Sequence, residues 1–88
     1  MMTPKNTVSE TMPAYPLVLA GEGEIVKVVG VHGGRLLRVR LLSMGINVED
    51  ELLVVNKQAN GAVLIEKSGY RYGFGGGMAH KINVIKVG

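Results

Sequence analysis

Residues 52–66 read LLVVNKQANGAVLIE and give the clearest structural signal in the chain. Two apolar runs, Leu52–Asn56 and Ala62–Glu66, stand on either side of Asn60-Gly61. Valine and isoleucine favour strands, and Asn-Gly between two such runs is typical of a tight antiparallel hairpin. The stretch therefore predicts two paired strands at the centre of the fold.

Shorter β-rich runs lie on both sides of that hairpin. Upstream, Ile25–Val31 is rich in valine, and Gly30 within it predicts a bulge or a tight bend. Downstream, Tyr70–Phe74 and Ile82–Val87 are the last two predicted strands. About five short strands at this spacing predict a mainly β domain, either a small barrel or a sandwich.

One short helix is predicted over residues 36–43. Leu37, Leu41 and Met44 recur at helical spacing, and Gly45 lies where a helix commonly ends in the left-handed conformation. A strand over the first half of this segment is the alternative. A further helical turn is predicted at Met78-Ala79-His80, just before the last strand.

Length and composition bound the class of protein. The chain has 88 residues, enough for one domain, and its net charge is +3. We expect residues 1–14 to be a disordered tail and residues 15–88 to form the domain. The chain has no cysteine, which excludes disulfides and thiolate metal sites. No apolar run approaches the roughly 20 residues that a membrane span needs, so we expect a soluble, cytoplasmic protein.

The residue types that usually carry catalysis are not arranged for it. Glu49, Asp50 and Glu51 are consecutive and so do not face one another, while His32 and His80 have no partner at metal-ligand spacing. The glycine-rich stretch 73–77 lacks the Gly-Lys-Ser/Thr of a phosphate loop. Close approach of another backbone segment explains such glycines better. We therefore expect a binding protein and not an enzyme.

Four segments together resemble the FeoA family of ferrous iron transport proteins. In chain order they are GEGEI (21–25), RLLSMGI (40–46), GYRYGFG (69–75) and MAHKINV (78–84). The resemblance runs from about Leu17 to Val87. It implies an SH3-like barrel and a stand-alone role beside FeoB, the membrane transporter of Fe²⁺ that carries a G-protein domain. The same domain also occurs in iron- and manganese-dependent repressors.

The chain departs from the family pattern at two places. The family commonly has Pro-Gly after its "MGL" motif, and Val48-Glu49 stands there instead. The Ala-Leu of the family's "ALG" motif is Gly73-Phe74, which puts a larger ring at a core position. We expect the fold to survive because the two volume changes partly compensate.

The resemblance and the charge pattern together predict a docking surface. Arg35, Arg38 and Arg40 lie among apolar residues that one short helix cannot bury completely, and such a patch suits an acidic partner surface. We predict that the contact residues for the cytoplasmic part of an FeoB-type transporter are the following: Arg38, Arg40, Leu42, Met44, Tyr70 and Arg71. Two alternatives stay open, an SH3-like nucleic-acid-binding module and a metal-responsive regulatory module. We expect no nucleic acid partner, no insertion in the membrane and no cofactor; weak binding of Fe²⁺ or another divalent metal stays open.

Overall fold

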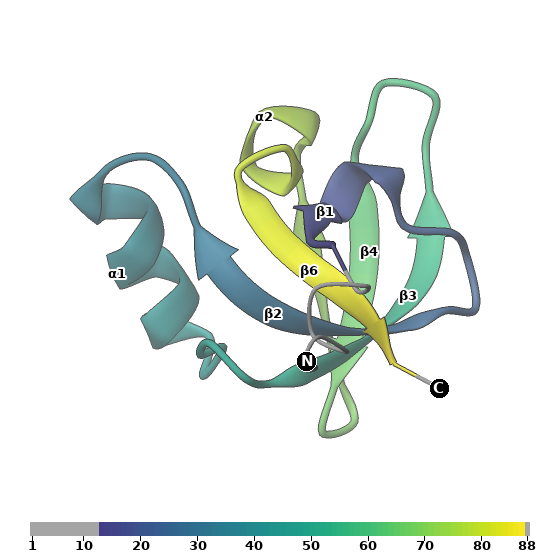
Figure 1. Cartoon of the computed structure of the whole chain (residues 1–88), viewed down its shortest axis with the longest axis horizontal. Coiled ribbons are helices and arrows are strands. Elements are labelled where there is room, and N and C mark those ends of the chain that lie inside the picture. The colour runs from purple at the N-terminus through teal and green to yellow at the C-terminus, as the bar shows by residue number, and fades with distance from the viewer. Residues whose placement is uncertain (1–12, 88) are drawn as a thin grey trace, which may run out of the picture.

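The computed structural model describes residues 13–87, so most of the predicted N-terminal tail lies outside the described residues. Figure 1 shows a curved antiparallel sheet with one helix set apart at one end of the molecule. In chain order the elements are β1 (Tyr15–Pro16), the 3-10 turn η2 (Leu17–Leu19), β2 (Ile25–Val31), α1 (Arg35–Ser43), β3 (Glu51–Lys57), β4 (Val63–Lys67), β5 (Tyr70–Phe74), α2 (Gly76–Ala79) and β6 (Ile82–Val87).

The six strands follow the order β1-β6-β2-β3-β4-β5, and every neighbouring pair is antiparallel. The predicted mainly β, SH3-like class is confirmed, as are the short helix and the helical turn before the last strand. The sequence analysis missed β1, because two residues that include a proline show no alternation. Within residues 13–87 no pairing joins β1 to β5, so the sheet stays open.

Two bulges bend the long strands. In the β2–β6 pair the register shifts between Val28 and Gly30, which confirms the predicted irregularity at Gly30. A second shift lies between Val54 and Asn56 in the β3–β4 pair. An extra residue on one strand increases local twist, so both bulges help the sheet to curve around its core.

The core lies on the concave face of the sheet. Alternate residues of the strands point inward because successive side chains of a strand face opposite sides. The fully buried apolar residues are Leu17, Ala20, Val26, Val28, Leu41, Ile46, Leu52, Val54, Val63, Ile65, Phe74, Ala79, Ile82 and Val84. Burial of each larger one stabilises the fold by about 1.5–3 kcal/mol before entropy is counted. Phe74 is 2% exposed, which confirms the prediction that its ring occupies a core position.

The glycine-rich stretch is crowded at one point. A Cβ on Gly76 would lie 2.7 Å from the carbonyl oxygen of Asn60, whereas one on Gly77 would meet nothing within 4 Å. The predicted close backbone approach is therefore confirmed at Gly76. This approach holds α2 against the β3–β4 loop, and it fixes where the following residues of α2 stand.

A Schellman motif ends α1. Gly45, at φ +76°, takes the left-handed conformation that the sequence predicted. Its N–H donates to the carbonyl of Leu42, and the N–H of Ile46 donates to that of Leu41, both at 2.9 Å. Leu41 and Ile46 are both buried, as this motif usually requires. The end of α1 is thus set by its own sequence and anchored in the core.

Candidate docking surface

The inward face of α1 is the one that its periodicity predicted. Leu41 is buried, while Leu37 and Met44 are partly buried and pack against the core. The helix begins at Arg35, one residue before the predicted start, and ends at Ser43. The alternative of a strand over its first half is wrong. Because one narrow face meets the core, most of α1 remains in contact with solvent.

The outer face of α1 carries an apolar stripe. Leu36, Val39 and Leu42 are 85%, 54% and 61% exposed and recur every third residue. At 100° per residue, Arg38 lies at one margin of this stripe and Arg40 at the other. We call these five residues the outer face of α1. A stripe of apolar side chains flanked by cations is a costly surface to leave in water, and such patches mark interaction sites.

Charge is unevenly distributed over the molecule. The nine residues of α1 include three arginines and no acid. The four ion pairs within residues 13–87 instead occupy Lys27, Lys67, Arg71 and Lys86. Arg38 donates only to the backbone carbonyl of Val31, at 3.3 Å. The positive charge of α1 therefore stays available to an outside partner.

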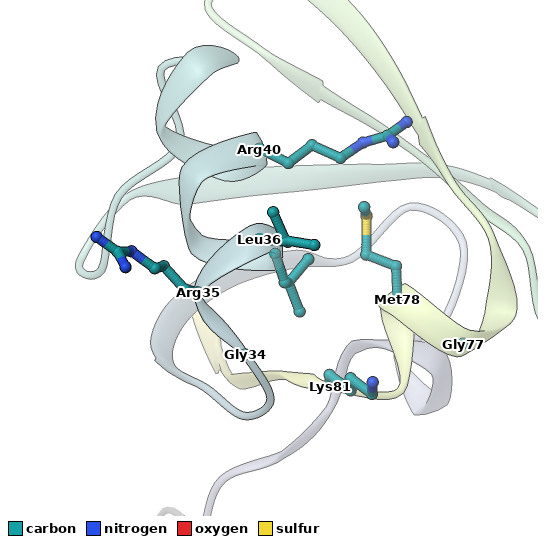
Figure 2. A pocket seen from close by; sticks show the side chains of 8 residues that line it. Gly34, Arg35, Leu36, Arg40, Gly77, Met78 and Lys81 are labelled. Atoms are coloured by element: carbon teal, nitrogen blue, oxygen red, sulfur yellow. The ribbon is translucent and has the colours of Figure 1, made fainter.

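A hollow flanks each side of α1. On the α2 side, a groove of about 640 Å³ is lined by Leu36, Leu37, Arg40, Met78 and Lys81, among others (Figure 2). On the other side, a smaller hollow of about 260 Å³ is lined by residues that include Arg38, Leu42 and Val48. Arg38 and Arg40, both predicted as contact residues, therefore line two different depressions.

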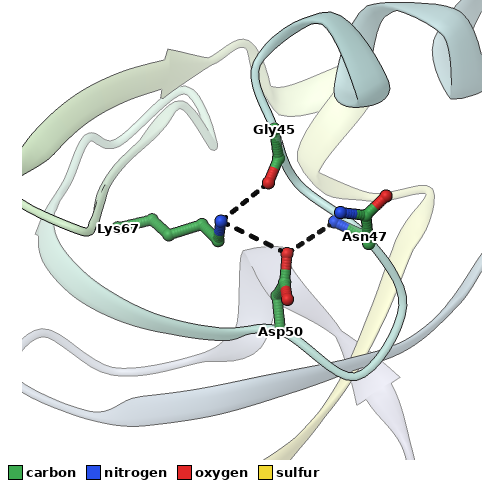
Figure 3. A network of polar contacts seen from close by, with 4 residues as sticks. All are labelled: Gly45, Asn47, Asp50 and Lys67. Carbon is green, nitrogen blue, oxygen red and sulfur yellow. Dashed lines mark hydrogen bonds and ion pairs between the residues drawn. The ribbon is translucent and has the colours of Figure 1, made fainter.

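A polar network fixes the loop that follows α1 (Figure 3). The Lys67 ammonium donates to the carbonyl of Gly45 at 2.7 Å and pairs with the Asp50 carboxylate at 3.4 Å. That carboxylate also accepts from the backbone N–H of Asn47 at 2.8 Å. These contacts join the end of α1 to the β4–β5 hairpin, which limits how far the helix can shift relative to the sheet.

The loop also holds a strained residue. Glu49 has φ +84°, a conformation that glycine adopts without cost. It stands where the resembled family has the glycine of Pro-Gly. Its N–H donates to the carbonyl of Val28 at 2.7 Å, which holds the backbone in place. The loop therefore keeps a left-handed residue although the usual glycine is missing.

The predicted contact residues lie on two parts of the fold, at α1 and on the β4–β5 hairpin. Arg38, Arg40 and Leu42 are exposed on α1, whereas Met44 is half-buried against the core. Tyr70, 68% exposed, and Arg71 lie on the β4–β5 hairpin, where Arg71 pairs with Glu66 at 3.3 Å. Val39, Met78 and Lys81 were not among the predicted contact residues. A helical projection that turned Leu37, Leu41 and Met44 inward would have placed Val39 outside.

Other candidate groups show no assembled centre. Within residues 13–87 no three His, Cys, Asp or Glu side chains are grouped so that they could hold a metal. His32 forms a hydrogen bond with Asn83, and His80 is exposed. None of the described helices has the length and apolar character to cross a membrane. Burial, and then the charge of Glu24, raise the pKa of the Tyr15 phenol.

Comparison with known proteins decides the family. Residues 15–86 match the FeoA domain. The chain belongs to the FeoA family. A relative from Methanocaldococcus jannaschii, which bears the name Fe(2+) transport protein A, is 44% identical over 70 residues, which cover 80% of this chain and 84% of the relative.

Solved structures agree with this assignment. The crystal structure of an iron uptake regulatory protein (FeoA) superposes with a TM-score of 0.78 at 31% identity, over 85% of this chain and 100% of that one. A manganese-dependent transcriptional repressor gives a TM-score of 0.79 at 19% identity, over 86% of this chain and 43% of the repressor. The repressor shares the fold alone, whereas the FeoA structure matches along its whole length.

Proposed function

We propose that this FeoA-family protein is a cytoplasmic, non-enzymatic accessory factor of ferrous iron transport that docks on the cytoplasmic part of an FeoB-type transporter. Family membership and the transport name of the M. jannaschii relative support the iron transport role. In this role Fe²⁺ is the cargo of the partner, so the function requires no resident cofactor.

One observation carries the docking step: the outer face of α1 combines an exposed apolar stripe with arginines that form no ion pair within residues 13–87. Arginine is enriched among the residues that dominate binding energy at interfaces, and exposed apolar patches mark interaction sites. The fold leaves Leu36 85% and Leu42 61% exposed. We propose Arg38, Arg40 and Leu42 as the principal contacts, with Met44 at the edge and Tyr70 and Arg71 as an extension along the β4–β5 hairpin.

The decisive experiment is a titration of this protein against the cytoplasmic domain of the same organism's transporter. The double variant Arg38→Glu/Arg40→Glu should weaken binding by at least about tenfold, because it replaces two attractions with two repulsions. The double variant Lys57→Glu/Lys86→Glu changes the net charge equally and lies outside α1, so it serves as the control. If charge reversal on α1 leaves the affinity unchanged, the assignment to α1 fails.

RNA should be run as a parallel ligand. Single-stranded nucleic acids bind through exposed aromatic platforms, but Phe74 is buried and Tyr72 is partly buried against the core. Only Tyr70 remains as a large exposed platform on β5. Binding to RNA alone, with a steep dependence on salt, would replace the transporter by a nucleic acid partner.

A further inference from the structure

The groove between α1 and α2 has an apolar floor. Leu36 and Met78 point into it from the two helices in Figure 2, and Leu37 completes the floor. Its volume is about 640 Å³, enough for several side chains of a partner. An apolar depression of this size gives a partner's side chain a place to leave water.

Two sides of the groove are held in place by contacts with the rest of the fold. The stem of Lys81 lies against Gly33, where an added Cβ would be 3.1 Å from the lysine Cδ. The backbone N–H of His32 donates a hydrogen bond to the carbonyl of Lys81 at 2.7 Å. On the α2 side, the close approach of Gly76 to Asn60 fixes the position of Met78. The sides of the groove that carry Lys81 and Met78 are therefore fixed by the fold.

The charged side chains that line the groove are all cationic. Figure 2 shows Arg40 and Lys81 on opposite sides of the apolar floor. Neither takes part in an ion pair within the part of the chain that the structure describes. The lining includes no aspartate or glutamate, and Arg35 at its edge adds a third cation. A cationic ligand is thus disfavoured, and a purely polar anion would leave the apolar floor unused.

We propose that the α1–α2 groove binds a protein segment in which apolar side chains are flanked by carboxylates. The apolar side chains pack on Leu36 and Met78, and the carboxylates pair with Arg40 and Lys81. This inference rests on the proposed docking function and adds to it the chemistry of the partner's segment. It makes Lys81, on the β6 side, part of the recognition surface together with α1.

Gly77 offers a way to block the groove without disturbing the fold. It lines the groove, and a Cβ built on it meets nothing within 4 Å. Gly77→Phe therefore places a ring at the groove's wall. Gly73→Phe is the matched control, because Gly73 also has open space around it but lies on β5, outside this groove.

The first arm of the test uses the full chain, labelled for NMR, and a blocked peptide with a Leu-Leu-Phe centre and two glutamates at each end. We expect saturable shifts of the backbone amides of Gly34, Leu36 and Gly77. Gly77→Phe and Lys81→Glu should each weaken binding about tenfold or more, while Gly73→Phe and Lys86→Glu should not. Unshifted groove amides, or equal binding of a peptide with lysines in place of glutamates, overturn the proposal.

The second arm uses the transporter's cytoplasmic domain and separates the two proposals. If Gly77→Phe abolishes transporter binding and Gly73→Phe preserves it, the groove is supported as the binding site for the transporter. Binding that survives Gly77→Phe and Lys81→Glu but is lost in Arg38→Glu overturns the groove and leaves docking through α1. Peptide binding in the groove without any transporter binding keeps the groove, and it removes the transporter as partner.

Discussion

Phe74 and Leu36 are both large apolar residues, yet Phe74 is 2% exposed and Leu36 is 85% exposed. Phe74 ends a strand whose inward positions are covered by the rest of the sheet. Leu36 lies on a helix that meets the core through one narrow face. The contrast shows that the sheet's apolar residues serve folding, whereas those on the outer face of α1 are available for binding.

The charges of the two regions differ in the same way. Four cations on the sheet, Lys27, Lys67, Arg71 and Lys86, pair with carboxylates. Such exposed pairs contribute little to stability, about 0–1 kcal/mol each, but they neutralise that surface. Around α1 the arginines have no such neighbours within the described residues, so the molecule presents one electropositive, partly apolar end.

The largest expected effect is on stability, and it distinguishes the core of the sheet from the outer face of α1. Phe74→Ala should lower the free energy of unfolding by about 3–5 kcal/mol, since it leaves a cavity in the core, whereas Leu36→Ala should change it by less than about 0.5 kcal/mol. Urea denaturation measures both. Because Phe74→Ala can unfold so small a domain, Phe74→Leu, with an expected loss below about 1.5 kcal/mol, is the companion variant. Equal losses for Phe74→Leu and Leu36→Ala would erase the distinction.

The glycine-rich stretch gives the next effect. Gly76→Ala should cost about 1–3 kcal/mol, because the new methyl group meets the Asn60 carbonyl at 2.7 Å and forces the backbone apart. Gly77→Ala should be neutral or should stabilise by up to about 1 kcal/mol, since alanine favours the helix and has open space. Thermal unfolding of the pair tests this. The reverse order of stabilities would contradict the crowding at Gly76.

A smaller gain is expected at the strained loop. Glu49→Gly should raise the free energy of unfolding by about 0.5–1 kcal/mol, because relief of the left-handed conformation outweighs the added freedom of the unfolded chain. Its ion pair with Lys27 is exposed and worth little. Glu49→Ala keeps a Cβ at that φ and serves as the control in urea denaturation. A similar gain in both variants would mean that the carboxylate, and not the backbone, causes the strain.

The smallest effect concerns alkaline pH. Since burial and Glu24 raise the pKa of Tyr15, the unfolded chain releases this proton first, near its ordinary value of about 10. The contribution of the protonated Tyr15 phenol to the free energy of unfolding is fully present below the unfolded pKa. It is lost as the pH rises through the higher folded pKa. Tyr15→Phe should therefore flatten the alkaline decline of the melting temperature, with Tyr70→Phe as the control. Parallel alkaline profiles for the parent and Tyr15→Phe would contradict this.

Much of the fold could be read from local signals. Asn60-Gly61 between β-branched runs predicted the central hairpin, and the spacing of Leu37, Leu41 and Met44 predicted α1 and its buried face. The bulge at Gly30 was also predicted correctly. β1 could not be predicted, because a two-residue strand is defined by its partner β6 and leaves no pattern of its own.

The candidate surface was only partly predictable for a related reason. Arg38, Arg40 and Leu42 stand close together in sequence, but the helix turns Arg38 and Arg40 to opposite margins of the apolar stripe. Met44, expected at the contact surface, is partly buried and also packs against the core. Lys81 and Met78 lie some forty residues from α1, so no local pattern linked them to it.

By itself the sequence determined the five longer strands, the helix, its left-handed end at Gly45 and the family motifs, since each depends on residues within a few positions of one another. Only the tertiary structure decided that α2 stands opposite α1, that a groove lies between them, and that Lys81 and Arg40 face one another across it. Those features depend on the pairing of β6 with β2 and on the approach of Gly76 to Asn60. Both contacts join segments distant in sequence, and such contacts are set by the packing of the whole core.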